Sequence, residues 1–171
     1  MKTFVIALIL FPAALAAQTQ TKFSISGKAL GFSAGGTGVA AADAVSAVQI
    51  SPNLTVRNDN IILSDPSSPS IAAFELGGAQ YDLPLSGVLK KTFLDPAKYK
   101  LYAVAEGGIV TSSLGQSPAA SAGIGLNYYP QSAPAVVINL FEARWINGRV
   151  PVSAARTATN GIAVSIGLTF K

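Results

Sequence analysis

The last segment of the chain alternates strictly between two kinds of residue. One parity is large and apolar, and the other is small or weakly polar. Because successive side chains of a β-strand point to opposite faces, a two-residue period predicts a strand whose faces meet different environments. The large apolar parity is Ile162, Val164, Ile166, Leu168 and Phe170, and the small parity is Ala163, Ser165, Gly167 and Thr169.

Seven earlier segments have the same character and are bounded by turn residues. Most of the eight run for about 9–13 residues. That is longer than the roughly 5–6 residues of an average strand and close to the about 9–11 residues of a transmembrane strand. We expect strands at 23–31, 45–50, 54–63, 71–83, 98–109, 120–128, 135–146 and 162–170.

Composition favours a membrane environment for these strands. The chain has 171 residues, of which 50% are hydrophobic and only 12% are charged, against a typical charged share of about 25%. We therefore predict an all-β fold, an antiparallel up-and-down barrel of about eight strands, with the apolar parity of the closing strand facing lipid. The alternative is a secreted, soluble β-sandwich that acts as a binding or structural module, because a sandwich core also needs one apolar face.

Missing residue types exclude several chemistries. The chain has no cysteine and no histidine, which excludes thiol nucleophiles, disulfides, cysteine-bound metals, serine–histidine triads and histidine-bound zinc. No glycine cluster has the strand-to-helix setting of a phosphate-binding loop. We expect no catalytic residue, cofactor or metal site, and so no enzyme. An exported enzyme remains a third class, since a pair of carboxylates could support glycoside hydrolysis.

The N-terminus has the three regions of a signal peptide. A basic start with Lys2 precedes the apolar run 4–11, and Ala14-x-Ala16 fits the small-residue cleavage rule. The run is too short for a membrane anchor of about 20 residues. We expect a signal peptide at 1–16 and a single barrel domain at 17–171. The protein would then be exported, to the bacterial outer membrane or, as the alternative, to an extracellular or periplasmic location.

Charge gives little sign of a nucleic-acid partner. The formal net charge is +4, and it falls to +3 when Lys2 is removed with the signal peptide. The longest basic run is Lys90-Lys91. We therefore expect no nucleic-acid binding.

Charged residues inside the expected strands should lie in the barrel interior. An arginine or lysine that faces lipid at the midplane costs about 2–4 kcal/mol, so these side chains should pair with one another and plug the lumen. Glu142 and Arg144 share parity with the apolar residues before them. Either a bulge resets this strand, or its upper end leaves the membrane. The expected lumen ion pairs involve Arg57, Lys98, Lys100, Glu106, Glu142 and Arg144.

The connections should alternate in length between the two rims of a barrel, with short inner turns and long outer loops. If the N-terminus lies on the inner side, the outer loops are 33–44, 64–70, 112–119 and 147–161. The inner connections 51–53 and 130–134 are short. The remaining inner connection, 84–97, is too long for this rule.

The chain resembles the small eight-stranded bacterial outer-membrane barrels, over 22–171 and as a pattern. The most specific part is the closing strand NGIAVSIGLTFK, which resembles the signal read by the barrel-assembly machinery, although Phe170 is penultimate and Lys171 is last. The resemblance implies a non-enzymatic structural or surface-interaction role, through exterior loops that meet an unidentified surface partner. Its other partners would be membrane lipid and the assembly machinery. The implied aromatic girdle residues are Phe23, Tyr81, Tyr99, Tyr128, Tyr129, Trp145 and Phe170.

Overall fold

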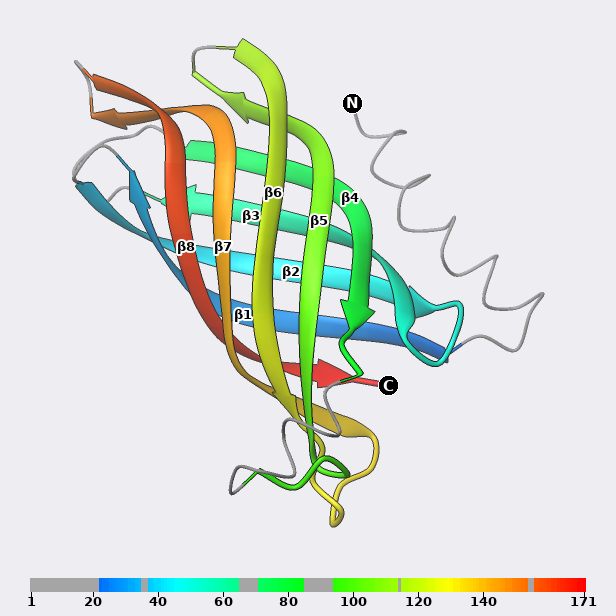
Figure 1. The fold of residues 1–171 in the computed structure, drawn as a ribbon. Helices are drawn as coiled ribbons and strands as arrows, with labels where there is room; N and C mark the ends of the chain where they lie inside the picture. Colours follow the sequence, from blue (N-terminus) through cyan, green and yellow to red (C-terminus); the bar gives the residue numbers. More distant parts are fainter. Residues whose placement is uncertain (1–21, 35–36, 65–70, 85–93, 114, 154–155) are drawn as a thin grey trace.

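The computed structural model describes residues 22–34, 37–64, 71–84, 94–113, 115–153 and 156–171. These residues form eight antiparallel strands in one closed barrel (Figure 1). The expected signal peptide, 1–16, lies outside the described residues. The strands are β1 (Lys22–Ala34), β2 (Thr37–Gln49), β3 (Leu54–Ser64), β4 (Ile71–Asp82), β5 (Tyr99–Ser112), β6 (Gly115–Tyr128), β7 (Val136–Ser153) and β8 (Arg156–Phe170).

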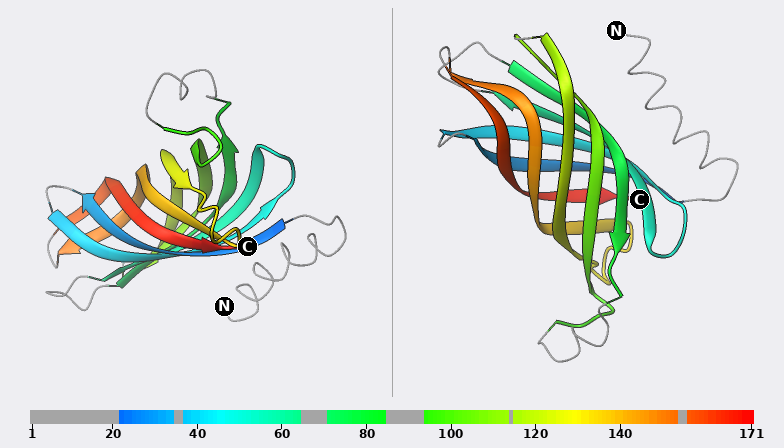
Figure 2. Two further views of the ribbon diagram at one scale, coloured as in Figure 1. Left: turned by 90° about the horizontal axis from the view of Figure 1, so that it is seen from below. Right: turned by 45° about the horizontal axis from the view of Figure 1, so that its top comes forward.

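The closure of the wall confirms the predicted fold class. Each strand pairs with its neighbours in sequence, and β8 returns to pair with β1 from Ile25 opposite Phe170 to Ala34 opposite Gly161. Figure 1 shows β8, in red, beside β1, in blue, and Figure 2 shows the same wall from two other sides. A closed wall leaves no strand edge unpaired. It also overturns the sandwich alternative, which needs two separate sheets.

The described residues contain strands and turns but no helix. No helical segment among them has the length and apolar character to cross a membrane.

The long outer loops predicted at 33–44, 112–119 and 147–161 are wrong. The strands run almost to their tips there: β1 ends at Ala34 and β2 begins at Thr37, while β7 ends at Ser153 and β8 begins at Arg156. In β2 the outward residues around 40–44 are alanines, so no large side chain marks the two-residue period. Glycine and proline interrupt the alternation at the end of β7, and the start of β8 is small or polar throughout, which hides the period in the same way. The fourth expected outer loop, 64–70, falls mainly on 65–70, outside the described residues.

The tip between β5 and β6 turns tightly. β5 ends at Ser112 and β6 begins at Gly115, whose φ of +95° lies in the left-handed region that favours glycine. The long connection 84–97 lies at the opposite rim, where β1 begins and β8 ends, and 85–93 are outside the described residues.

The closing strand sorts its side chains by parity. Ile162 and Ile166 are 59% and 60% exposed, while Ala163 and Ser165 are 1% and 2% exposed. The large apolar side chains therefore point outward and the small ones point into the interior. Val164, Leu168 and Phe170 are outward as well.

Aromatic residues gather at the rim where β1 begins and β8 ends. Tyr99 opens β5 and Tyr128 closes β6, and their rings lie 5.1 Å apart. Tyr81 and Phe170 lie at the ends of β4 and β8 and are 45% and 56% exposed. Outward aromatics in a ring are typical of the interface between lipid and water. Tyr129 does not belong to this ring, since it lines the interior instead.

Because the chain has no cysteine, the two faces of β8 can be distinguished by labelling single introduced cysteines. Ile166→Cys should react with a lipid-phase probe and resist a water-soluble one, since its side chain points out of the wall. Ser165→Cys, one residue away and pointing inward, is the matched control and should react with neither. The measurement is labelling of the folded protein in membranes. Equal protection of the two introduced thiols from the lipid-phase probe would mean that the outer face of β8 is covered by protein.

Candidate functional site

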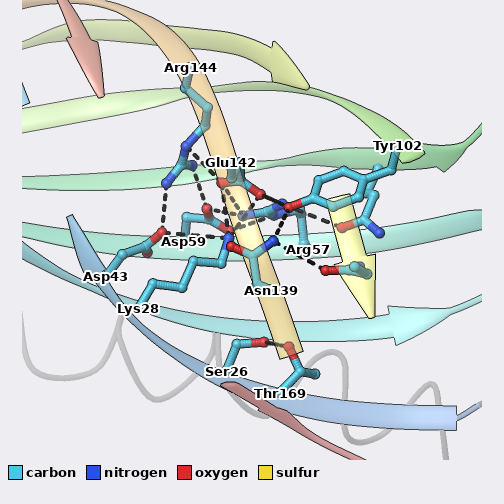
Figure 3. A network of polar contacts seen from close by, with 12 residues as sticks. Ser26, Lys28, Asp43, Arg57, Asp59, Tyr102, Asn139, Glu142, Arg144 and Thr169 are labelled. Atoms are coloured by element: carbon cyan, nitrogen blue, oxygen red, sulfur yellow. Dashed lines mark hydrogen bonds and ion pairs between the residues drawn. The ribbon is translucent and has the colours of Figure 1, made fainter. Parts of the chain in front are cut away.

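Seven charged side chains meet in the middle of the barrel interior, where they form what we call the charge network. They come from five strands and are joined by ion pairs (Figure 3). Each has less than a tenth of its surface exposed. The members are Lys28, Asp43, Arg57, Asp59, Glu106, Glu142 and Arg144.

Glu142 is the member with the most partners. Lys28 Nζ lies 2.9 Å from both of its carboxylate oxygens. Arg57 Nη1 lies 3.0 Å from Oε2, and Arg144 Nε lies 3.0 Å from Oε1. The hydroxyl of Tyr102 donates to Oε2 at 2.5 Å. One carboxylate therefore meets all three basic members of the network and a phenol.

Arg144 spans the network from the other direction. Its Nη2 lies 2.6 Å from Asp43, and its Nη1 lies 2.5 Å from Asp59 and 2.9 Å from Glu106. The planar guanidinium has five N–H donors in a fixed fork. Here that fork joins carboxylates from β2, β3 and β5 to β7, so Arg144 ties four strands of the wall together.

Arg57 makes the remaining links. It pairs with Asp59 on its own strand, and its Nε lies 3.1 Å from Glu106. Its Nη1 also donates to the amide oxygen of Gln80 at 3.4 Å. Arg57 and Arg144 thus share Asp59, Glu106 and Glu142 between them.

Neutral side chains supply further hydrogen-bond donors to the carboxylates. Ser121 donates to Glu106 at 2.6 Å, in addition to the Tyr102 contact with Glu142. Asn139 in turn donates to the hydroxyl oxygen of Tyr102 at 2.8 Å and to Asn127 at 3.1 Å. Because these donors meet the two glutamates, the excess of four carboxylates over three bases is matched by O–H groups.

Two glycines of β6 make room for the largest members. A Cβ at Gly125 would overlap the ring of Tyr102, and a Cβ at Gly123 would overlap Arg144 and the backbone oxygen of Ala143. The close approach of backbone to side chain requires glycine at both positions. This accounts for the glycines that alternate with apolar residues in β6.

A register shift in β7 brings Glu142 and Arg144 inward. The pairing of β7 with β8 shifts between Asn139 and Glu142. The side chains of Asn139, Glu142 and Arg144 are all buried in the interior. Of the two alternatives that the sequence left open, the structure has the first, a bulge that resets the parity of the strand.

Above and below the charge network the interior changes character. Towards the rim where β1 ends and β2 begins, an apolar cluster fills the barrel, including Phe32, Ile61, Phe74 and Leu76. Towards the rim where β1 begins, a cavity of about 340 Å³ opens, lined by residues such as Lys22, Gln49 and Thr55. An eight-stranded barrel is just wide enough for side chains to fill. Here they fill the middle and one end and leave the other end hollow.

The mouth of this cavity is positively charged. Lys22, Lys100 and Lys171 line it, with Asp82 as an acidic neighbour. Burial and then the charges of Lys22 and Lys100 lower the pKa of Lys171. The Nζ of Lys171 also lies 4.5 Å from the ring centroid of Tyr129, in cation–π geometry.

The expected site residues divide into two groups. The structure brings Arg57, Glu106, Glu142 and Arg144 together in the charge network. It places Lys98 and Lys100 elsewhere, beside other carboxylates. Lys98 lies 3.8 Å from Asp95, and Lys100 lies 3.2 Å from Asp82. Both lysines lie at the rim, before the strand reaches the middle of the barrel.

Three members of the charge network were missed by the sequence reading. Lys28, Asp43 and Asp59 share the inward parity of their strands with buried neighbours such as Leu30 and Ile61. That parity was the available signal for Lys28 and Asp59. For Asp43 there was none, because 33–44 was expected to be a loop.

Three carboxylates of the network have the spacing of metal ligands. Oxygens of Asp43, Asp59 and Glu142 lie within 4.8 Å of one another. Arg144 pairs with all three, and Arg57 and Lys28 take further oxygens. The three carboxylates therefore lie beside the three basic side chains of the network.

Comparison with known proteins bears on the fold. No family model matches the chain, and no curated protein matches it either. Among solved structures, neisserial surface protein A is 13% identical, with a TM-score of 0.61 over 87% of this chain and 95% of that chain. The fold is that of a small outer-membrane barrel.

Two further solved structures are similar over most of their length. The N-terminal β-barrel domain of Pseudomonas aeruginosa OprF is 13% identical, with a TM-score of 0.49 over 88% of this chain and 98% of that chain. Ail, the attachment invasion locus protein of Yersinia pestis, is 12% identical, with a TM-score of 0.46 over 88% of this chain and 96% of that chain. At such identities a likeness concerns architecture and not activity.

Arg144→Ala tests how far the wall depends on the charge network. It leaves Asp43, Asp59, Glu106 and Glu142 facing only two basic groups, so the free energy of unfolding should fall by about 3–5 kcal/mol. The measurement is urea unfolding of the detergent-folded barrel. Lys98→Ala is the control: its ion pair is at the exposed rim, where such pairs contribute less than about 1 kcal/mol. Equal, small effects of the two variants would show that the network does not stabilise the fold.

Proposed function

We propose that the protein is a non-enzymatic barrel of the bacterial outer membrane whose lumen is closed by its own side chains. The observation that carries this proposal is the filling of the interior. A layer of seven paired charges lies against a layer of apolar side chains, and both consist of buried residues. A solute that crossed the barrel would have to separate both layers.

The outer surface supports the membrane location. The outward side chains of β8 are large and apolar, and each is 45–60% exposed. In water, an exposed apolar patch of this kind is a liability. In lipid, it is the surface that a transmembrane barrel requires. The outward aromatics at one rim fit the same placement.

The absence of enzymatic activity is proposed from the site's chemistry. Every carboxylate of the charge network lies beside arginine or lysine, and the apolar cluster separates the network from the rim where β1 ends. Ion pairs of this kind serve the structure. None of the described residues offers a carboxylate with a neighbouring nucleophile that is open to a substrate from that rim.

A surface-interaction role would fall on the strand tips more than on loops. β7 and β8 continue past Asn147 and Asn160 as paired strands to Ser153 and Arg156. Figure 1 shows these ends projecting at the upper left, beside the tip of β5 and β6. A projecting rim of paired strands is a surface that a partner outside the cell could meet.

The plug can be tested in planar lipid bilayers. The purified barrel should insert without steady conductance, because the charge network and the apolar cluster leave no continuous water path. Folding is checked in the same sample by the shift in gel mobility on heating. A steady ion current from protein that shows this shift would contradict the closed lumen, and the membrane location would survive that result.

Placement in the outer membrane can be tested separately by labelling intact cells. Ser113 lies at the tip between β5 and β6, and Ser51 lies in the turn at the other rim; both are exposed. Ser113→Cys should react with a membrane-impermeant maleimide on intact cells, and Ser51→Cys should react only after the outer membrane is opened. Reaction of both without permeabilisation, or of neither, would contradict the proposed location and orientation.

A further inference from the structure

The cavity at the rim where β1 begins is the part of the interior that side chains leave unfilled. Its volume is about 340 Å³, which lies within the roughly 300–1,000 Å³ of small-molecule sites. A water molecule takes up about 30 Å³, so the space exceeds what a simple ion needs. The charge network forms the floor of the cavity. A solute can therefore enter from this rim without passing through the barrel.

The floor of the cavity is basic. Lys28 and Arg57 line it, together with Tyr102 and Asn139, and each of these four side chains is buried. The four carboxylates of the charge network are not among the lining residues. The network therefore presents bases to the cavity, while its carboxylates lie behind them.

The mouth of the cavity brings three lysines together. The ammonium groups of Lys100 and Lys171 lie 5.5 Å and 4.5 Å from the ring centroid of Tyr129, and Lys22 lines the same cavity. Asp82 lies 3.2 Å from Lys100 and is the only acidic side chain among the described lining residues. Lys22 and Lys171 make no ion pair with any described side chain. Two of the three ammonium groups are therefore free to meet an anion.

The lysines of the mouth are close enough to repel one another. After burial, the charges of Lys22 and Lys100 are the main causes that lower the pKa of Lys171. An anion between these groups relieves that repulsion. A lysine ammonium is a compact point charge and a common ligand of phosphate in proteins. The mouth therefore has the chemistry of a phosphate site.

The walls between mouth and floor carry neutral polar side chains. Along β1 the lining residues run from Lys22 at the mouth through Ser24 and Ser26 to Lys28 at the floor. The neighbouring strands β2 and β3 add Gln49 and Thr55, and β4 and β8 add Gln80 and Thr169. Hydroxyl and amide groups both donate and accept hydrogen bonds. The walls therefore suit a ligand that carries hydroxyl groups.

We infer that the cavity binds a small phosphate monoester with several hydroxyl groups, of the sugar-phosphate class. Lys22, Lys100 and Lys171 hold the phosphate at the mouth, and the hydroxyl and amide side chains of the walls hold the sugar. A lipid headgroup at the same rim has the same phosphate chemistry, and the experiment separates the two sources. The lysines line the interior and not the outer wall, which favours the soluble ligand. The inference goes beyond the proposed closed lumen and is compatible with it, since the ligand does not cross the charge network.

Isothermal titration of the detergent-folded barrel in a phosphate-free buffer tests the site. Glucose-6-phosphate should bind more tightly than inorganic phosphate, because only the sugar reaches the walls. Glucose should give no measurable binding, because it lacks the charge that the lysines attract. Raising the ionic strength should weaken the binding of glucose-6-phosphate, since salt screens the lysines of the open mouth.

A charge variant with a matched control tests the mouth. Lys22→Gln combined with Lys171→Gln should raise the dissociation constant of glucose-6-phosphate on the order of tenfold. Lys98→Gln is the control, because Lys98 lies at the same rim beside Asp95 and does not line the cavity. It removes a positive charge from the rim and should leave the dissociation constant unchanged. The mobility shift on heating confirms that each variant has folded.

A second variant separates the cavity from the surface of the rim. Ala47 is an inward residue that lines the cavity, so the ring of Ala47→Phe occupies part of the empty space and leaves every lysine in place. This variant should lose the binding of glucose-6-phosphate by tenfold or more. Ala44→Phe is the control, since Ala44 lies on the exposed outward face of the same strand.

Four results would overturn the inference. One is the absence of binding of glucose-6-phosphate by folded protein. Another is equal weakening by Lys98→Gln and by the variant of the mouth. A third is unchanged binding by Ala47→Phe, because the phosphate would then lie on the surface of the rim. The last is binding of short-chain phosphatidylglycerol without binding of glucose-6-phosphate, which would assign the lysines to lipid. A steady current in planar bilayers would instead contradict the closed lumen alone.

Discussion

Closure of the wall is the constraint on which the other features depend. Eight strands closed on themselves satisfy the backbone hydrogen bonds along the wall, and they leave an interior that only side chains can fill. Any charge that enters that space loses water on all sides, so it must be matched there. The charge network meets this demand with three bases, four carboxylates and two hydroxyl donors.

The network in turn holds the wall in its closed form. Arg144 on β7 reaches Asp43 on β2, and Lys28 on β1 reaches Glu142 on β7. These contacts cross the barrel between strands that are far apart in the sequence, so each is lost if the wall opens. The bulge in β7 is needed for these same contacts. Without it, Glu142 and Arg144 would keep the parity of the outward Leu140 and would face out of the wall.

Features that depend on a single strand, such as the face on which a side chain lies, could be predicted from the sequence. Features that depend on several strands, such as the partners of interior charges, could not. The parity of 162–170 sufficed to place Ile166 outside and Ser165 inside, because alternation is a local property of a strand. Partners in the interior depend on the register and tilt of all eight strands. Lys28 and Glu142 are 114 residues apart, and nothing local to either names the other. Lys100 shows the same limit: it lies near the mouth of the cavity, where its partner is Asp82.

The ends of some strands were predicted wrongly for a related reason. A two-residue period is visible only where the two faces carry different kinds of residue. In β2 the outward residues around Ala42 and Ala44 are small, and beyond Asn147 the residues Gly148 and Pro151 interrupt the alternation of β7. Such segments read as loops although they are paired strands. The strands predicted from the sequence are therefore too short, and the predicted loops are too long. For the same reason the sequence assigns the expected surface role to loops and not to strand tips.

β3 carries polar side chains on both its inward face and its outward face. Its centre is the polar run Arg57-Asn58-Asp59-Asn60, which has no apolar face at all. The inward pair, Arg57 and Asp59, is matched by the charge network from across the barrel. The outward pair, Asn58 and Asn60, lies on the other face of the strand, where the Nδ2 of Asn58 is buried without a hydrogen-bond partner among the described residues. The same rule that assembles the charge network, that polar groups removed from water must find polar partners, therefore acts on the outer face of β3. Inside the barrel the partners are other strands of the chain.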